Sequence, residues 1–339
     1  MFRAYRIDRN AVPAAGKPAD RFVEMDESEL DDGDVLIRVG YSSVNHRDAR
    51  VASGVEAIRR YPCVAGSDLA GWVVSSAAPR FRPGMAVLAT GYELGSRHHG
   101  GYADYALVPG GWVFPVPEGM GCRDAMAIGS AGLAAAMAIT RMEENGLRPE
   151  RGPVLVSGAS GGVGSLAIDM LAGRGYEVVA LTGKPGQAEY LGMLGAARVL
   201  LRSEIELSVT SGLDKGVWAG AVDVLGGDVL AWMLAGIKPG GVVASLGNCE
   251  SSALQAGVLP FASRGICLIG VDTVYAGFKA REVAWGRLAS DLKPRHLDHI
   301  AREIAFEALP GTFGDFMNAC ARGRTIVRIA GQGGVKEET

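Results

Sequence analysis

Residues 154–165 read Val-Leu-Val-Ser-Gly-Ala-Ser-Gly-Gly-Val-Gly-Ser, so that three apolar residues are followed by closely spaced glycines. The apolar run predicts a strand that is buried on both faces. Residues 159–164 fit the G/A-x-G-x-x-G pattern of dinucleotide-binding turns, with alanine in the first position. In this pattern Gly161 lets the backbone approach a pyrophosphate, and Gly164 lets the next helix pack on the strand. We expect the cofactor to be contacted at Ser160, Gly161, Gly162, Val163, Gly164 and Ser165.

The central part of the sequence alternates between strands and helices. Residues 166–171 have apolar side chains at helical spacing directly after the turn. Further strands are expected at 177–181, 197–201, 220–225, 242–246 and 267–271. Glycine-rich turns by themselves occur in many loops. The alternation, however, predicts an α/β fold, a doubly wound parallel sheet that binds its ligand at the carboxyl ends of the strands.

The first part of the chain has a different pattern. Short apolar runs separated by Pro and Gly predict a mostly β domain with strands at 35–39, 72–74, 86–89, 105–108 and 112–114. A helix expected over 131–147 then leads into the dinucleotide unit.

The last part returns to mixed elements. Helices are expected at 281–292 and 313–321, strands near 304 and at 325–329, and a frayed tail at 331–339. We therefore divide the chain into a first domain over 1–130, a dinucleotide-binding domain over 131–273 and a return to the first domain over 274–339.

Composition limits the class of protein. The chain has 339 residues, of which 48% are hydrophobic and 21% charged, and this length suits two domains. The net charge of −3 offers no basic face for nucleic acid. Arg3, Arg6 and Asp8 lie where a signal peptide would need an apolar core, and we see no apolar segment of membrane-spanning length. Five scattered cysteines argue against a disulfide framework and a structural zinc cluster. We expect a cytoplasmic protein.

Several ordered motifs resemble one family. They are Ser42-Ser-Val-Asn-His-Arg-Asp48, Gly66-Ser-Asp-Leu-Ala-Gly71, Gly100-Gly-Tyr-Ala-Asp104, Ala125-Met-Ala-Ile-Gly-Ser-Ala-Gly132 and Trp218-Ala-Gly-Ala-Val-Asp223. Together they resemble the medium-chain dehydrogenase/reductase superfamily, and more narrowly its acryloyl-CoA reductase branch of YhdH-type quinone oxidoreductases. The resemblance implies a Rossmann domain, a β-rich GroES-like catalytic domain, and a homodimer paired through the edge strand near 267–271.

The resemblance also implies that a catalytic metal is absent. Zinc enzymes of the superfamily use a Cys, a His beside the Gly-x-Glu turn and a second Cys, whereas Ser67 occupies the position of that His here. His98 and His99 form the one close histidine pair. Adjacent side chains on an extended chain point in different directions, which favours a loop position near the mouth of the cleft over a metal site.

Cofactor choice depends on the end of the second strand. NAD-preferring folds ordinarily place Asp or Glu there to bind the ribose 2′-OH. This chain has Thr182, Gly183 and Lys184, which accommodate a 2′-phosphate, and Arg202 is similar in position to an arginine that the family uses on that phosphate. The alternative is that Lys184 and Arg202 are solvated surface charges. Together these residues favour NADPH.

Candidate catalytic residues lie in Asn45-His46-Arg47-Asp48, where the family carries Asn-Tyr-Lys-Asp. By resemblance the family tyrosine lies beside the nicotinamide, so His46 is the candidate for contacting the cofactor, orienting the substrate or donating a proton. The alternative is that His46 fills space and solvent supplies the proton. Asn45 either donates to the substrate carbonyl or caps a turn. We expect Arg47 and Asp48 to form a local ion pair, Asp68 to be buried structure, and Asn248 to line the nicotinamide pocket.

These observations predict an enzyme with a small-molecule substrate. The first hypothesis is a zinc-independent, NADPH-dependent reduction of the conjugated double bond of a short enoyl thioester such as acryloyl-CoA. Because His46 and the stretch 92–99 depart from the family pattern, reduction of a quinone or an enone is the second hypothesis. The third is a non-catalytic NADPH-binding protein.

Overall fold

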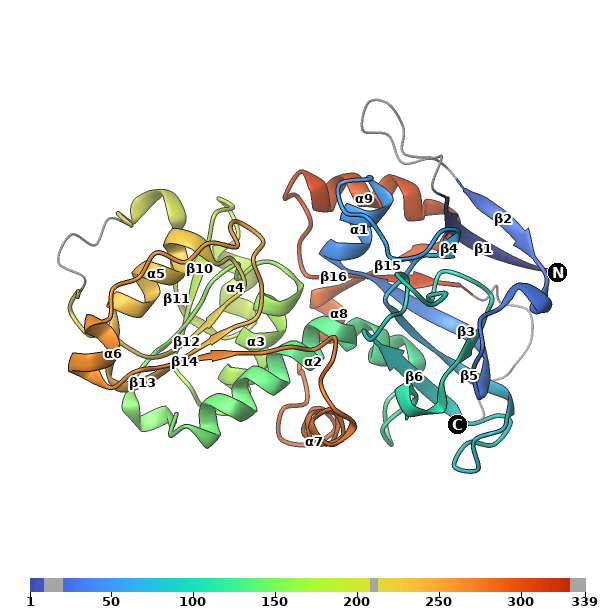
Figure 1. The fold of residues 1–339 in the computed structure, drawn as a ribbon. Coiled ribbons are helices and arrows are strands. Elements are labelled where there is room, and N and C mark those ends of the chain that lie inside the picture. Colours follow the sequence, from blue (N-terminus) through green and yellow to red (C-terminus); the bar gives the residue numbers. More distant parts are fainter. Residues whose placement is uncertain (9–20, 208–212, 330–339) are drawn as a thin grey trace. The chain divides into compact units, whose positions relative to one another are not determined.

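The computed structural model describes residues 1–8, 21–207 and 213–329 (Figure 1). The chain divides into two compact units: the first is Met1–Ser130 with Ala301–Thr339, and the second is Ala131–Ile300. The expected return to the first domain at residue 274 is therefore misplaced. Asp169 accepts hydrogen bonds from the backbone N–H groups of Arg295 (2.7 Å) and His296 (3.1 Å), which fixes that segment within the second unit. The tail expected at 331–339 lies outside the described residues.

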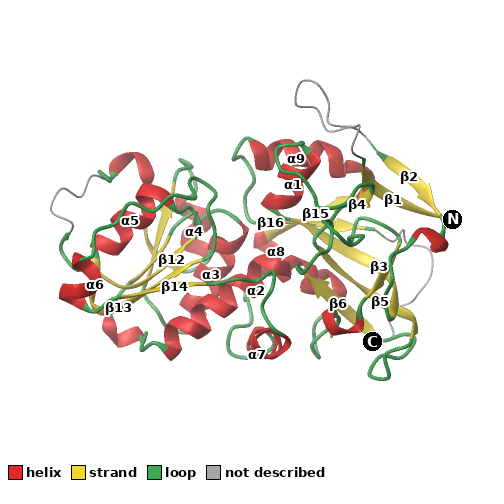
Figure 2. Cartoon of the chain, in the orientation of Figure 1, coloured by secondary structure: helices red, strands yellow, loops and turns green. Residues whose placement is uncertain are grey.

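The second unit is built on a six-stranded parallel sheet. Its strands are β9 (Val154–Val156), β10 (Val178–Thr182), β11 (Ala196–Leu201), β12 (Trp218–Asp223), β13 (Ile237–Ser245) and β14 (Cys267–Gly270). Its helices are α3 (Gly162–Gly173), α4 (Ala188–Met193), α5 (Gly227–Ala235), α6 (Leu259–Arg264), α7 (Phe278–Leu288) and α8 (Leu297–Ile300). Figure 2 shows the helices packed around the strands.

The strand order of this sheet is β11-β10-β9-β12-β13-β14. In chain order this is 3-2-1-4-5-6, the order of a dinucleotide-binding fold, so the predicted doubly wound sheet is confirmed. All three residues of β9 are buried, as a strand covered on both faces requires. The order reverses between β9 and β12, and ligands of such sheets bind where the strand ends diverge.

The first unit is mostly β, as predicted. Its main sheet runs β15 (Ala301–Ala305), β16 (Arg324–Arg328), β3 (Val35–Val44), β5 (Asp68–Ser76), β6 (Ala86–Thr90) and β8 (Phe114–Pro115), with β7 (Tyr105–Val108) paired to β3. A smaller sheet holds β2 (Phe22–Met25), β1 (Phe2–Ile7) and β4 (Cys63–Val64). Helix α1 (His46–Ala52) packs against α9 (Leu309–Met317). The strand expected at 112–114 is instead a 3₁₀ turn at Gly110–Trp112 followed by β8, because Pro109 and two glycines favour a turn.

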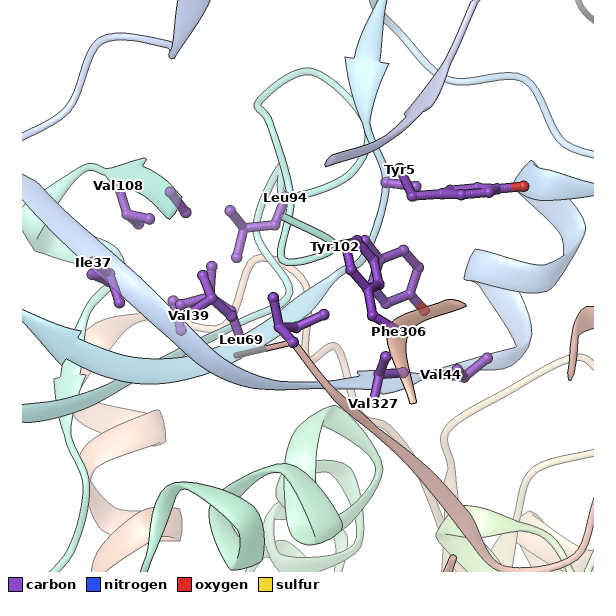
Figure 3. Close-up of a cluster of buried hydrophobic side chains, with 14 of the residues drawn as sticks. Tyr5, Ile37, Val39, Val44, Leu69, Leu94, Tyr102, Val108, Phe306 and Val327 are labelled. Atoms are coloured by element: carbon purple, nitrogen blue, oxygen red, sulfur yellow. The ribbon is translucent and has the colours of Figure 1, made fainter. Parts of the chain in front are cut away.

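The core of the first unit joins residues from both ends of the chain. Figure 3 shows Val39 and Leu69 from the central strands in the same cluster as Tyr102, with Phe306 and Val327 contributed by the C-terminal return. All five are at most 1% exposed. The return segment is therefore an integral part of this hydrophobic core, and burying such side chains is the main stabilising contribution.

We expected a helix over 131–147, whereas helix α2 runs from Cys122 to Glu144, so it begins nine residues earlier and ends three residues earlier. It contains a break at Gly129, whose φ of 51° and ψ of −157° are not helical. By length and composition this helix is apolar enough to cross a membrane, contrary to our expectation that the chain has no such segment. Because 83% of its apolar window is buried inside the protein, it is a core helix.

Candidate active site

The turn between β9 and α3 leaves backbone donors free for an anion. Gly161 is the N-cap of α3, and no side chain caps the helix. The N–H groups of Gly162, Val163 and Gly164 lie in the first turn, where helix geometry gives them no carbonyl partner. With the positive end of the helix dipole, they form an anion site of the kind that binds a pyrophosphate.

Close packing explains two glycines of this turn. A Cβ on Gly164 would lie 2.5 Å from the carbonyl oxygen of Gly158 and 2.7 Å from Cα of Ala159, so only glycine fits there. Gly158 has a φ of +56°, in the left-handed region. We assigned the first position of the pattern to Ala159, and the residue before it carries the unusual backbone conformation. Gly158 lies just before the predicted pattern, which begins at Ala159, so the pattern did not include it.

The two serines of the turn are buried and bonded within the unit. The hydroxyl of Ser160 lies 3.2 Å from that of Thr182 at the end of β10. The Ser165 hydroxyl donates to the carbonyl of Ala159 at 3.3 Å and accepts from the Tyr190 hydroxyl at 2.9 Å. These bonds tie the turn to β10 and α4. Contact of either serine with a cofactor stays a prediction.

The end of β10 meets Arg202 as the sequence predicts. Thr182 pairs in register with Leu201, so Arg202 follows at the adjacent strand end. The backbone N–H of Lys184 donates to Thr182 Oγ1 at 3.1 Å, which shapes the turn at Gly183. The Nε of Arg202 is buried without a hydrogen-bond partner among the described residues. An unpartnered buried guanidinium N–H is costly, and a phosphate oxygen is the partner that it suits.

Asn248 is exposed in the segment after β13.

Two residues that we did not predict, Ser157 and Asp223, meet at the neighbouring strand ends. The Ser157 hydroxyl donates to Asp223 Oδ1 at 2.8 Å, and the carboxylate also accepts from the N–H groups of Leu225 (3.1 Å) and Gly226 (3.0 Å). Burial raises the pKa of Asp223, while these hydrogen bonds oppose the rise. The two strands that flank the reversal, β9 and β12, each have a polar residue at the carboxyl end, Ser157 and Asp223. This pattern in the sequence could have predicted the pair.

In the first unit, Asn45 belongs to a buried polar network. Its amide nitrogen donates to Ser67 Oγ at 3.1 Å and to Asp68 Oδ2 at 2.9 Å, while its oxygen accepts from Arg324 Nη1 at 2.9 Å. Both amide hydrogens and the oxygen are therefore engaged. This arrangement favours the structural interpretation of Asn45 at the start of α1 over donation to a substrate carbonyl.

Arg324 is the centre of that network, and no local pattern in the sequence indicates it. Its side chain is 3% exposed, and its guanidinium donates to Ser43 Oγ at 2.7 Å and to the carbonyl of Ala127 at 3.1 Å. Asp68 Oδ2 lies 3.8 Å from Arg324 Nη2. Burial lowers the pKa of Arg324, and the charge of Asp68 opposes that shift. As we expected, Asp68 is buried structure.

Asp48 is buried beside the network and does not form the expected ion pair with Arg47. It accepts from the backbone N–H groups of Asn45 (2.8 Å) and Ser67 (3.1 Å), whereas Arg47 Nε binds Glu56 Oε1 at 3.0 Å. The prediction failed because the start of α1 turns Asp48 inward to bond the N–H of Asn45. Burial, together with the charge of Asp68, raises the pKa of Asp48 to about 6.

His46 is the first residue of α1 and is half-buried. No hydrogen bond joins its ring to the described part of the chain. Burial lowers the pKa of His46, the charge of Arg50 lowers it further, and Glu56 opposes the shift. The ring is therefore neutral at pH 7, with one nitrogen able to donate and the other able to accept.

The histidine pair is buried in the segment between β6 and β7. His99 Nδ1 accepts from the backbone N–H of Val64 at 2.9 Å, and His98 Nε2 lies 3.2 Å from the carbonyl of Asp32. Both rings thus hold loops together. Among residues 1–8, 21–207 and 213–329, no three His, Cys, Asp or Glu side chains are grouped to hold a metal ion. Independence from metal stays a prediction.

Comparisons with known proteins agree on the type of fold. Residues 31–118 match the alcohol dehydrogenase GroES-like domain. The "Acrylyl-CoA reductase AcuI" of Ruegeria pomeroyi is 40% identical over 97% of this chain and 99% of its own length. The "Putative quinone oxidoreductase YhfP" of Bacillus subtilis is 42% identical over the same shares.

Two solved structures are similar over nearly the whole chain. The yhdH oxidoreductase of Salmonella enterica in complex with NADP is 39% identical, covers 97% of this chain and 100% of that one, and superposes with a TM-score of 0.92. Bacillus subtilis yhfP with NAD bound is 42% identical, covers 96% and 99%, and has a TM-score of 0.90.

Proposed function

The chain belongs to the medium-chain dehydrogenase/reductase family, in the branch of the acrylyl-CoA reductases and YhdH-type oxidoreductases, and on that premise we propose that it is an NADPH-dependent enzyme. It reduces the conjugated double bond of a short enoyl thioester such as acryloyl-CoA. The observation that carries this proposal is the 40% identity with an acrylyl-CoA reductase over 97% of the chain.

NADPH fits the second unit. When bound, it supplies the hydride that adds to the β-carbon of the substrate. The first-turn N–H groups of α3 hold its pyrophosphate, and Arg202 and Lys184 hold its 2′-phosphate. The unpartnered Nε of Arg202 supports this assignment, because the 2′-phosphate would give this buried donor a partner that the described residues do not supply. One similar solved structure, that of Bacillus subtilis yhfP, has NAD bound. In this chain we assign the preference for NADPH to Arg202 and Lys184, because their cations suit the 2′-phosphate.

His46 supplies the chemistry that the cofactor does not. Negative charge develops on the thioester oxygen as the hydride adds, and the α-carbon must then receive a proton. The neutral ring of His46 offers a free N–H, whereas the amide of Asn45 is committed to the buried network. His46 therefore donates its N–H to the enolate oxygen, or delivers the proton to the α-carbon from its protonated form, and Asn45 holds the start of α1 in place.

Reduction of quinones is the second candidate, because the 42% identical relative from Bacillus subtilis carries a quinone oxidoreductase name. Turnover of acryloyl-CoA, crotonyl-CoA and a simple benzoquinone with NADPH separates the candidates. We expect a kcat/KM for the thioesters at least tenfold above that for the quinone. Faster turnover of the quinone would replace the proposal by the second candidate. If the protein loaded with NADPH turns over none of these substrates, the third hypothesis, a non-catalytic NADPH-binding protein, would replace the proposal.

Three further properties belong to the proposal. The protein pairs as a homodimer through β14, which ends the sheet and would otherwise leave its backbone edge uncovered. It works without zinc, so dialysis against a strong chelator leaves turnover unchanged. It resides in the cytoplasm, as its scattered free cysteines suit. A monomer mass in light scattering at micromolar protein, or activity that zinc restores after chelation, would contradict the first or the second property.

A further inference from the structure

Ser67 joins three elements of the first unit just before β5 begins. Its backbone N–H donates to Asp48 Oδ1 in α1 at 3.1 Å, and its carbonyl accepts from the N–H of Gly91, directly after β6, at 2.8 Å. The next residue, Asp68, pairs in register with Thr90 of β6. The sheet therefore fixes the backbone of Ser67, and a group that the Ser67 side chain binds is held at a defined place.

The hydroxyl of Ser67 bridges two residues at the start of α1. It accepts from Asn45 Nδ2 at 3.1 Å and donates to Asp48 Oδ2 at 3.2 Å. Asp48 Oδ2 also accepts from the N–H of Asn45 at 2.8 Å, which closes a cycle of three hydrogen bonds. Ser67 is buried, and hydrogen bonds away from water are electrostatically stronger. One hydroxyl thus ties the first turn of α1 to the start of β5.

His46 lies within the segment that this cycle holds, because it comes directly after Asn45 and two residues before Asp48. Its imidazole makes no hydrogen bond to the described part of the chain. Helix α1 has seven residues, and so short a helix is not stable without contacts to the rest of the protein. The place of the imidazole therefore depends on the bonds that hold the first turn of α1.

We propose that Ser67 is the positioning residue for His46: its hydroxyl holds the first turn of α1 against β5, so that the imidazole meets the substrate in one orientation. This inference rests on the proposed function, in which His46 acts on the substrate. Without the hydroxyl, Asn45 keeps its bonds to Asp68 and Arg324, and Asp48 keeps its bonds to backbone N–H groups. The segment therefore loosens without unfolding.

The test compares Ser67→Ala with Ser42→Ala. Ser42 is the matched control, because it is also buried and its hydroxyl donates to the backbone carbonyl of Asp68 at 2.6 Å rather than to α1. Each substitution is made in wild type and in His46→Ala, and kcat and KM are measured with crotonyl-CoA and NADPH. NMR then records the Cε1–H signal of His46 in each protein saturated with NADP⁺, and the loss of this signal in His46→Ala identifies it.

We expect the kcat of Ser67→Ala to fall about tenfold, because a displaced catalytic group loses its alignment with the substrate. Its KM for NADPH stays unchanged. In the His46→Ala background the same substitution changes kcat less than about twofold, since a residue that acts through His46 then has nothing to position. The His46 signal moves in Ser67→Ala, whereas Ser42→Ala keeps both the wild-type signal and the wild-type kcat.

The inference is overturned if Ser67→Ala turns over as wild type does, if Ser42→Ala lowers kcat equally, or if the effects of Ser67→Ala and His46→Ala on kcat multiply. Because the NMR measurement needs no turnover, it is independent of the proposed reaction. A wild-type protein that does not reduce crotonyl-CoA would contradict the proposed function. In that case a His46 signal that moves in Ser67→Ala alone supports the inference, and an unmoved signal overturns it.

Discussion

The two units hold their functional groups in different ways. In the second unit the proposed anion site consists of backbone N–H groups at the start of α3, positioned by a short stretch of consecutive residues. In the first unit the polar network is made of side chains from β3, β5 and β16, which are far apart in the sequence. A backbone site tolerates changes of most side chains but not of its glycines, whereas a side-chain network depends on every charged member.

The largest effect is expected from breaking the buried network. Arg324→Leu leaves the carboxylate of Asp68 buried without its cation, and removing one partner of a buried pair typically costs about 3–5 kcal/mol. Urea denaturation measures the loss. The matched control is Arg328→Leu, because the Arg328 side chain is 41% exposed and the loss of its pair with Glu303 costs at most about 1 kcal/mol. Equal free energies of unfolding for the two variants would contradict the claim that the first unit depends on its buried network.

The buried carboxyl of Asp48 predicts a pH dependence. Its folded pKa of about 6 lies above its ordinary value of 3.8, so the folded state binds the proton more tightly than the unfolded state does. This group therefore stabilises the fold at low pH, and that contribution is lost as the pH rises from about 4 to about 6. Asp48→Asn removes the dependence.

The measurement for Asp48 is the free energy of unfolding of variant and wild type at several pH values. Between pH 4 and pH 7 the difference should move in favour of Asp48→Asn by about 3 kcal/mol, which is the size of the pKa shift. A difference that is constant with pH, or that moves in favour of wild type, would mean that the carboxyl ionises normally in the fold.

Replacing a glycine of the turn between β9 and α3 is expected to abolish cofactor binding. Gly164→Val forces side-chain atoms against the Gly158 carbonyl, which a Cβ would already approach to 2.5 Å. We expect NADPH affinity to fall at least a hundredfold in a fluorescence titration. Gly192→Ala in α4 is the control, because a Cβ there meets nothing within 4 Å, and it should bind NADPH normally. Normal binding by Gly164→Val would refute the close packing of the turn.

A smaller effect is expected where a side chain assists the backbone site. Arg202→Gln removes the buried donor that we propose for the 2′-phosphate, so the preference for NADPH over NADH should fall about tenfold to a hundredfold. Arg198→Gln is the control, because this exposed arginine stacks on Trp218 instead. If Arg202→Gln keeps the wild-type ratio of the two dissociation constants, Lys184 or another group recognises the phosphate.

The sequence predicted the second unit better than the first for a physical reason. The turn at 158–164 and the strands around it are specified by local spacing, and all six expected strands are present within a few residues. The network around Asn45 is specified by contacts with Asp68 and Arg324, which no local pattern reveals. The return at Ala301 was misplaced for the same reason, since a bond between Asp169 and the segment at Arg295 decides it.

The most direct test of the account compares His46→Ala with wild type in two measurements made together, turnover of crotonyl-CoA and affinity for NADPH. If His46 acts on the substrate while the second unit binds the cofactor, kcat falls about a hundredfold and the dissociation constant of NADPH changes less than threefold. His46→Tyr recovers much of the activity and shifts the pH profile, because a phenol titrates near pH 10. Normal turnover by His46→Ala would contradict the account and reduce His46 to a spacer.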